Sequence, residues 1–259
     1  MNYYAGIDSG STSTELVVLD DEARIISYHK TLTSGDIKAS ANTVMNLTLD
    51  ELGCSYEDLK MVVSTGYGRK NINFAHKSVT EITCYAAGAN YLAPNVRTVI
   101  DIGGQDSKVI LIDGKGRVQN FVMNDKCAAG TGKFLEMLAN TFNVKTGELG
   151  GLSEKAGSGK DFKLSSICAV FAESEMISLF SQGIAKEDII HAAHQAVCER
   201  VVGMVSRVGQ EEQVMFCGGV ARNTGTVKVF EKLLKTSLIL PENVDRVGAL
   251  GAALAAKKA

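Results

Sequence analysis

The stretch GIDSGSTST at residues 6–14 decides how we interpret this chain of 259 residues. An apolar run leads into it, Asp8 stands at the tip, a glycine follows, and a hydroxyl-rich return enters a second apolar run. This order is typical of a β-hairpin that binds phosphate, because backbone N–H groups and Ser or Thr hydroxyls donate to phosphate oxygens. Asp8 would hold a hydrated Mg²⁺. Taken alone, a plain hairpin with a Ser/Thr-rich turn would give the same pattern.

An internal repeat strengthens the phosphate interpretation. The sequence IDSG at 7–10 is repeated as IDIG at 100–103, and the similarity extends further, because Asp20 and Arg24 match Asp113 and Arg117. Two copies of this unit predict two similarly built α/β halves that face each other, with a phosphate chain and its metal in the cleft between them. We expect the halves to span 1–95 and 96–245, and helix 246–259 to pack back on the first.

Two further glycine pairs extend the predicted nucleotide site. Gln105 follows Gly103-Gly104 directly, where a glutamine would orient an attacking water, as in Ras-type enzymes. We expect the next two charged residues, Asp106 and Lys108, to form a solvated pair. Gly218-Gly219 ends a later apolar strand, and paired glycines leave room for a flat ring such as adenine against the backbone.

The cysteines form a second set of candidates, at positions 54, 84, 127, 168, 198 and 217. Cys127 and Cys168 each precede a segment with helical periodicity, and a thiol at a helix start is biased toward thiolate and so toward metal or redox chemistry. We expect Cys84, Cys198 and Cys217 to be core or pocket-lining residues. His191 and His194 have the spacing of a metal pair on a predicted helix over 186–208, but they lack a third ligand, which favours a solvated or packing role.

The composition excludes several classes of protein. The net charge of -2 gives no reason to expect nucleic-acid binding. No apolar run reaches the roughly 18 to 20 residues of a membrane span, and the N-terminus lacks the pattern of a signal peptide. We therefore expect a cytoplasmic protein, whose reducing surroundings argue against a disulfide framework.

Seven motifs together carry a family resemblance that covers nearly the whole chain. They are GIDSGST at 6–12, TGYGR at 65–69, VIDIGGQD at 99–106, MNDKCAAGTG at 123–132, CAVFAESE at 168–175, GGVA at 218–221 and GALGAAL at 248–254. The chain resembles the superfamily of acetate kinase, sugar kinases, Hsp70 and actin, whose duplicated halves are ribonuclease H-like. More narrowly, it resembles the BadF/BadG/BcrA/BcrD ATPase family, which includes ATP-dependent activators of 2-hydroxyacyl-CoA dehydratases.

This resemblance implies a homodimer with one [4Fe-4S] cluster at its two-fold interface, held by Cys127 and Cys168 of each chain. ATP hydrolysis would drive a low-potential electron, supplied by ferredoxin or flavodoxin, into a 2-hydroxyacyl-CoA dehydratase or a related iron–sulfur reductase. Asp8 and Asp101 would bind Mg²⁺ through its water shell, and Gln105 would orient the attacking water. The resemblance assigns ATP or ADP binding to Gly10, Ser11, Thr12, Ser13, Gly103, Gly104, Gly218, Gly219 and Gly248.

Two rival interpretations remain open at this stage. The first is a small-molecule kinase of the same fold, acting on a sugar or an acid, in which Cys127 and Cys168 are buried thiols. The second is a nucleotide-gated interaction protein like an actin or Hsp70 core, although the chain lacks their added subdomains. The motifs do not specify the partner enzyme or its substrate, because they are common to activators that serve different reductases.

Overall fold

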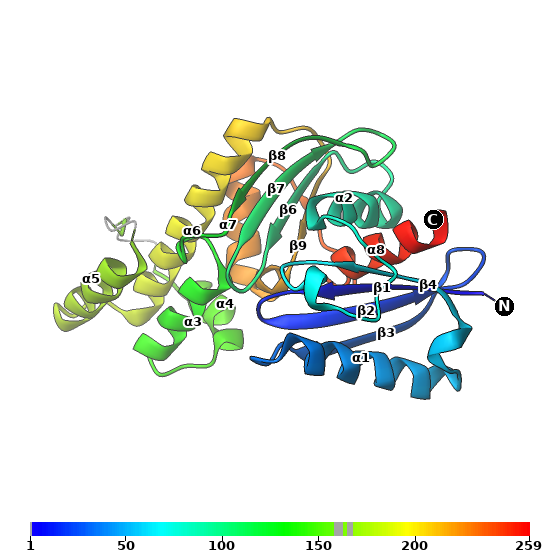
Figure 1. Ribbon diagram of the computed structural model, residues 1–259. Helices are drawn as coiled ribbons and strands as arrows, with labels where there is room; N and C mark the ends of the chain where they lie inside the picture. Colours follow the sequence, from blue (N-terminus) through cyan, green and yellow to red (C-terminus); the bar gives the residue numbers. More distant parts are fainter. Residues whose placement is uncertain (1, 158–162, 165–167) are drawn as a thin grey trace. The chain divides into compact units, whose positions relative to one another are not determined.

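The computed structural model describes residues 2–157, 163, 164 and 168–259 (Figure 1). The segment KLSSI at 163–167, which forms a hydroxyl-rich approach to Cys168 in the sequence, lies in part outside them, at positions 165–167. The chain divides into two compact units. The first contains Met1–Val99, Ile112–Gln119 and Glu242–Ala259, and the second contains Ile100–Leu111 and Asn120–Pro241. None of the described helices is long and apolar enough to cross a membrane.

The first unit is built on a five-stranded sheet in the order β3-β2-β1-β4-β5. Its strands are β1 (Tyr3–Ser9), β2 (Ser13–Leu19), β3 (Ile25–Leu32), β4 (Leu59–Thr65) and β5 (Lys77–Ser78). β2 pairs antiparallel with both β1 and β3, while β4 runs parallel to β1 and β5. The register of β1 and β2 places Asp8 opposite Glu15, at the strand end that leads into the hydroxyl-rich turn.

Helices cover both faces of this sheet. They are α1 (Ile37–Leu52), α2 (Glu81–Leu92) and α8 (Val247–Lys258), with short 3₁₀ turns at Tyr56–Asp58 and Arg69–Asn71. Alternate residues of a strand point to opposite faces, so Ile7 and Leu16 join the core under α1, whereas Tyr4 and Val17 join the core under α8 and α2. α1 ends at Gly53, which adopts the left-handed conformation at φ 60°.

The small residues of α8 allow this helix to approach the sheet very closely. A Cβ atom at Gly6 of β1 would overlap the backbone of α8 at Ala249 and Ala253, and a Cβ at Gly251 of α8 would overlap the backbone of Cys84 in α2. Backbone atoms cannot swing aside as a flexible side chain does, so glycine is required at both contacts.

A second sheet, most of whose residues belong to the second unit, repeats the strand order of the first. Its order is β10-β9-β6-β7-β8, built from β6 (Thr98–Ile102), β7 (Ser107–Ile112), β8 (Val118–Asn124), β9 (Val214–Cys217) and β10 (Leu238–Ile239). If β6 to β10 are matched in turn to β1 to β5, the two orders are the same. The described helices are α3 (Gly132–Thr141), α4 (Leu149–Ser153), α5 (Ala169–Ser181), α6 (Lys186–Val208) and α7 (Thr224–Leu234), with 3₁₀ turns at Thr146–Glu148 and Gly219–Arg222.

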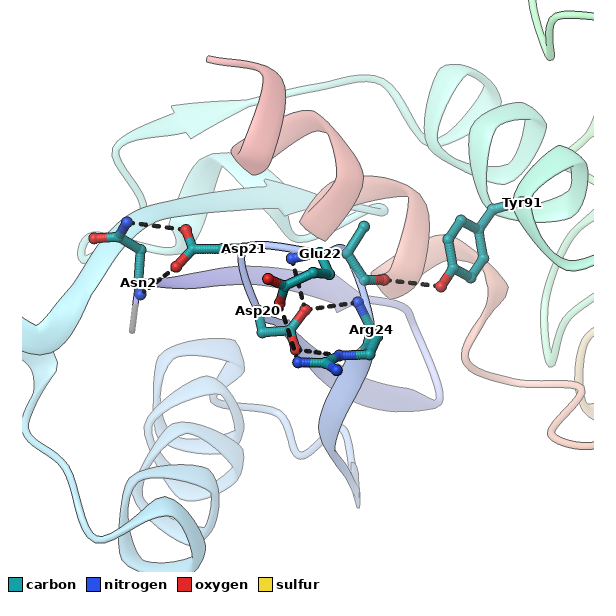
Figure 2. A network of polar contacts seen from close by, with 7 residues as sticks. Asn2, Asp20, Asp21, Glu22, Arg24 and Tyr91 are labelled. Carbon is teal, nitrogen blue, oxygen red and sulfur yellow. Dashed lines mark hydrogen bonds and ion pairs between the residues drawn. The ribbon is translucent and has the colours of Figure 1, made fainter.

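The repeat extends to individual hydrogen bonds in the turn between the second and third strands. The Asp20 carboxylate accepts from the backbone N–H groups of Glu22 and Arg24 and, at 2.6 Å, from Nε of Arg24 (Figure 2). Asp113 accepts in the same way from the N–H groups of Lys115 and Arg117 and, at 2.7 Å, from Nε of Arg117. The predicted match between these two segments is therefore confirmed in structure.

Candidate functional site

The first acidic turn lies in the first unit, where β1 ends. The Asp8 side chain is almost fully buried, and glycines leave the space that its carboxylate occupies. A Cβ at Gly66 would overlap Oδ1 of Asp8, and a Cβ at Gly248 would overlap Oδ2. Gly248, which the sequence assigned to nucleotide binding, thus makes room for the acidic side chain itself.

The hydroxyl-rich loop after Asp8 is held by its own backbone. The N–H of Gly10 donates to the carbonyl of Ser13 at 3.0 Å, and Thr33 donates to the carbonyls of Gly10 and Thr12, each at 2.9 Å. Ser11, Thr12 and Ser13 remain half-buried. Ser9 Oγ is fully buried and has no hydrogen-bond partner within the described residues. Buried hydroxyls are normally paired, so this atom fits a loop that completes its bonds with a ligand or its water shell.

Buried carboxyl groups gather near the first turn, where Glu15 lies opposite Asp8 in the register of β1 and β2. Burial, followed by the charge of Asp8, raises the pKa of Glu15 to about 8. Lys30 lies 3.6 Å from Glu15 and 2.5 Å from Asp245, and its ammonium offsets negative charge at this pair. An acidic, oxygen-rich environment of this kind suits a hydrated divalent cation. The sequence had not indicated a role for Glu15 or Asp245.

The second acidic turn, in the second unit, differs in its charge. Asp101 ends β6 and is 1% exposed, and Lys108 on β7 is 2% exposed. The Lys108 ammonium lies 3.0 Å from Oδ2 of Asp101 and 2.7 Å from Oδ2 of Asp106. The expected pair of Asp106 and Lys108 is therefore confirmed, but the expectation that it is solvated is wrong for the ammonium. The adjacent strands bring Lys108 against Asp101, and the burial of that contact removes the ammonium from solvent.

Gly218 completes the environment of Asp101. A Cβ at this position would lie 2.6 Å from Oδ1 of Asp101 and 2.5 Å from the carbonyl oxygen of Ile102. Its φ of 82° is a second reason for glycine. The space beside the Cα of Gly219 is open, with no atom of the described residues within 4 Å of a Cβ built there. This open backbone is compatible with the ring-binding role predicted for the pair.

The turn Gly103-Gly104 connects the second acidic turn to α3. The N–H of Gly103 donates to the carbonyl of Asp106 at 3.0 Å, which matches the bond from Gly10 to Ser13 in the first unit. The N–H groups of Gly132 and Lys133, in the first turn of α3, donate to the carbonyls of Gly103 and Gly104 at 2.9 and 2.7 Å. Gln105 is exposed at the tip of this turn.

The two candidate cysteines differ in their relation to the helices that follow. Cys168 is the N-cap residue of α5 and is exposed, as predicted for a thiol at a helix start. Cys127 is half-buried in a loop, where its carbonyl accepts from the side chain of Asn124 at 2.8 Å. α3 begins only at Gly132, after the N-cap Thr131, so the placement of Cys127 at a helix start is wrong.

The remaining cysteines are less suited to ligation. Cys84, Cys198 and Cys217 are fully buried, as predicted, and Cys54 is half-buried. Burial raises the pKa of Cys84 to about 12 and that of Cys198 well above its ordinary value, which opposes the thiolate that metal binding requires.

No group of three or more His, Cys, Asp or Glu within the described residues could hold a metal ion. A Cys₄ cluster therefore fits this chain only if a second chain supplies half of the ligands. His191 and His194 pack as predicted. His194 is fully buried beside Asn223, at 3.0 Å between their side-chain nitrogens, and burial lowers its pKa to about 3. His191 bonds Ser153 at 3.1 Å.

Comparisons with known proteins agree with this fold. A ROK family glucokinase from Streptomyces griseus superimposes with a TM-score of 0.61 at 14% identity, over 99% of this chain and 100% of that chain. A likeness at this identity shows the fold alone, and it confirms the predicted α/β class shared by the sugar-kinase-like ATPases.

Closer relatives cover almost the whole length of the chain. The 2-hydroxyisocaproyl-CoA dehydratase activator of Clostridioides difficile is 43% identical over 97% of this chain and 94% of that protein. The crystal structure of component A of (R)-2-hydroxyglutaryl-CoA dehydratase from Acidaminococcus fermentans is 41% identical and has a TM-score of 0.94, covering 100% of this chain and 98% of that one. The structure of the activator of the 2-hydroxyisocaproyl-CoA dehydratase from Clostridium difficile, with bound ADPNP, has a TM-score of 0.91 at 42% identity. The match covers 99% of this chain and 94% of that one.

The family model that matches describes nearly every element discussed above. It spans residues 5–256, from β1 to the last turns of α8, and so includes both acidic turns and both candidate cysteines. The chain belongs to the BadF/BadG/BcrA/BcrD ATPase family.

Proposed function

We propose that this protein is an ATP-hydrolysing activator that transfers a low-potential electron to a 2-hydroxyacyl-CoA dehydratase or a related iron–sulfur reductase. The observation that carries this proposal is the presence, in one chain, of two acidic phosphate-type turns and an exposed cysteine at the N-cap of α5. The names of three relatives at 42–43% identity, all activators of acyl-CoA dehydratases, favour this function over a small-molecule kinase.

In the first unit, Asp8 would hold Mg²⁺ through its water shell. Gly10, Ser11, Thr12 and Ser13 would donate to the phosphate oxygens of ATP, because their loop presents backbone N–H groups and hydroxyls next to the acidic tip. Gly248 and Gly66 keep the Asp8 carboxylate in position by leaving it space.

In the second unit, Asp101 and the turn Gly103-Gly104 would contact the phosphate end of the nucleotide. Gln105, exposed at the tip of this turn, would orient the attacking water, as a glutamine does in Ras-type enzymes. The open backbone at Gly219, next to Gly218, would accept the adenosine.

Cys127 and Cys168 would hold a [4Fe-4S] cluster together with the same two residues of a second chain. When bound, such a cluster supplies a one-electron carrier of low potential. α5 supports an assembly of two chains, because Val170, Phe171 and Ile177 are exposed on the side of the helix away from its buried residues Ala172 and Met176. An apolar surface of this kind, next to an exposed ligand, is typical of a contact with another chain. Ferredoxin or flavodoxin would supply the electron.

The decisive experiment is anaerobic purification followed by iron analysis and ATP hydrolysis. We expect brown protein with about four iron atoms per dimer, and ATP turnover that needs no added sugar or acid. Cys168→Ser should abolish the iron while nucleotide binding persists, and the buried Cys198→Ser is the matched control that should retain the iron. Colourless protein after anaerobic reconstitution, or turnover that depends on a phosphate acceptor, would overturn the proposal.

A further inference from the structure

Lys108 is a buried ammonium at the second acidic turn. Its side chain is 3% exposed, and it contacts Asp101 and Asp106 at 3.0 and 2.7 Å. Removing a charge from water costs several kcal/mol, and an apolar residue of similar volume often serves stability as well as a buried ion pair does. Stability alone is therefore a weak reason for a lysine at this position.

The contacts of Lys108 join the two parts of the turn that are proposed to meet the phosphate end of ATP. Asp101 stands at the end of β6. Asp106 closes the turn through its carbonyl, which accepts from Gly103, and its Oδ1 lies 2.5 Å from where a Cβ of Gly103 would be. One ammonium thus fixes the orientation of the strand-end carboxylate and the shape of the glycine turn.

The internal repeat shows that this charge is specific to the second turn. Asp8 and Glu15 occupy the positions in the first unit that Asp101 and Lys108 occupy in the second, since both pairs are separated by seven residues and both follow the same strand–turn–strand order. The first turn therefore places a carboxyl group beside its acidic tip, whereas the second places an ammonium there. The repeat has kept the spacing of the turn and replaced a buried carboxyl group by a buried ammonium.

We propose that Lys108 is a positioning residue that orients and neutralises Asp101, so that the attraction for Mg²⁺ is concentrated on the first turn, at Asp8. This inference rests on the proposed ATPase function. It assigns unequal tasks to the two acidic turns: the first draws the cation, and the second presents to the phosphate end a glycine turn and a carboxylate whose orientation is fixed and whose charge is partly offset.

The test compares Lys108→Met with Lys108→Arg and with Lys115→Met, a control at an exposed lysine. ATP hydrolysis is measured against MgATP and against free Mg²⁺. In Lys108→Met we expect kcat to fall by about 10-fold or more, because a reacting group displaced by even 1 Å can cost up to about 10²-fold. KM for MgATP should change by less than about 3-fold. The second turn, whose two carboxylates no longer have an ammonium beside them, should lower the Mg²⁺ concentration that gives half-maximal activity. Lys108→Arg should restore most of kcat, and Lys115→Met should behave as wild type.

A purely structural role makes different predictions. It would lower the thermal midpoint of Lys108→Met but leave kcat per folded molecule and the Mg²⁺ dependence unchanged, and that result would overturn the inference. Should Lys108→Met fail to fold, the double variant Asp106→Asn/Lys108→Met removes one uncompensated carboxylate. We expect it to fold and to remain at least about 10-fold low in kcat, whereas wild-type turnover in the double variant would also overturn the inference. An inactive wild-type protein would instead refute the proposed ATPase function.

Discussion

Gly248→Ala offers a direct test of the way Asp8 is positioned. Gly248 lies in the first turn of α8, and a Cβ at this position would overlap Oδ2 of Asp8 and lie 2.7 Å from the Tyr85 ring. The atoms nearest to this Cβ thus belong to side chains rather than to the backbone. The overlap can therefore be relieved by a shift of the Asp8 carboxylate. An unstrained contact needs a separation of roughly 3.5 Å, which requires a shift of Asp8 on the order of 1 Å.

The expected effects on stability and on activity are different in size. Replacing a helical glycine by alanine favours folding by about 1 kcal/mol, whereas the crowding costs about 1–3 kcal/mol, so the net loss of stability should be at most about 2 kcal/mol. A displacement of a reacting group by about 1 Å can reduce turnover by about 10²-fold. We therefore expect a folded protein with a large loss of ATP hydrolysis.

Gly203→Ala is the matched control. Gly203 also lies inside a helix, α6, but no atom of the described residues lies within 4 Å of a Cβ built there. This variant should gain the helix-forming contribution of about 1 kcal/mol and hydrolyse ATP at the wild-type rate. Steady-state hydrolysis and thermal unfolding, measured on both variants, separate the two effects. Wild-type turnover in Gly248→Ala would refute the argument that this glycine positions Asp8.

Three further predictions concern the second unit and the titrating groups. Gly132→Ala places a Cβ 3.0 Å from the carbonyl oxygen of Gly103, and it should weaken both ATP hydrolysis and iron retention in the same protein preparation; loss of one alone would contradict a shared element. His194 has a folded-state pKa of about 3, below its unfolded value. The stability that it contributes is therefore present above about pH 6.5 and falls with the pH, by about 2 kcal/mol at pH 5. His194→Gln should reduce this pH dependence in thermal unfolding curves. Glu15 has the opposite effect on the pH dependence of stability, because its folded-state pKa of about 8 exceeds the unfolded value. It destabilises the fold progressively as the pH rises from about 4.5 to 8. Glu15→Gln should add a few kcal/mol to the free energy of unfolding at pH 8 and almost nothing at pH 4.

The duplicated fold could be predicted from the sequence because the repeat preserves residues that make the same local bonds. Asp20 and Arg24 were matched to Asp113 and Arg117 only by their spacing, yet each pair closes the same turn. The helix 186–208 was predicted to the residue, since a long amphipathic segment bounded by Gly183 and Gly209 leaves little freedom in its ends.

The sequence did not predict contacts between side chains on different strands or elements. Lys108 was expected in solvent because charged residues near a turn are usually exposed. Its burial follows from the pairing of β6 with β7, which brings it against Asp101, and no pattern within the strand itself reports that contact. The sequence likewise did not indicate that a Cβ at Gly248 would overlap Asp8, which lies on a strand more than 200 residues earlier.

Backbone hydrogen bonds connect the second acidic turn to the segment that follows the loop of Cys127. Gly132 and Lys133 donate their backbone N–H groups to the carbonyls of Gly103 and Gly104, and those two donors are among the groups that the start of a helix leaves without intrahelical partners. Each such bond adds only about 1 kcal/mol net, but a buried donor left unmade costs about 1–3 kcal/mol. The glycine turn and the start of α3 should therefore move as one piece. A change of the turn on nucleotide hydrolysis would then reach Cys127, five residues before Gly132, without any rearrangement of the sheet.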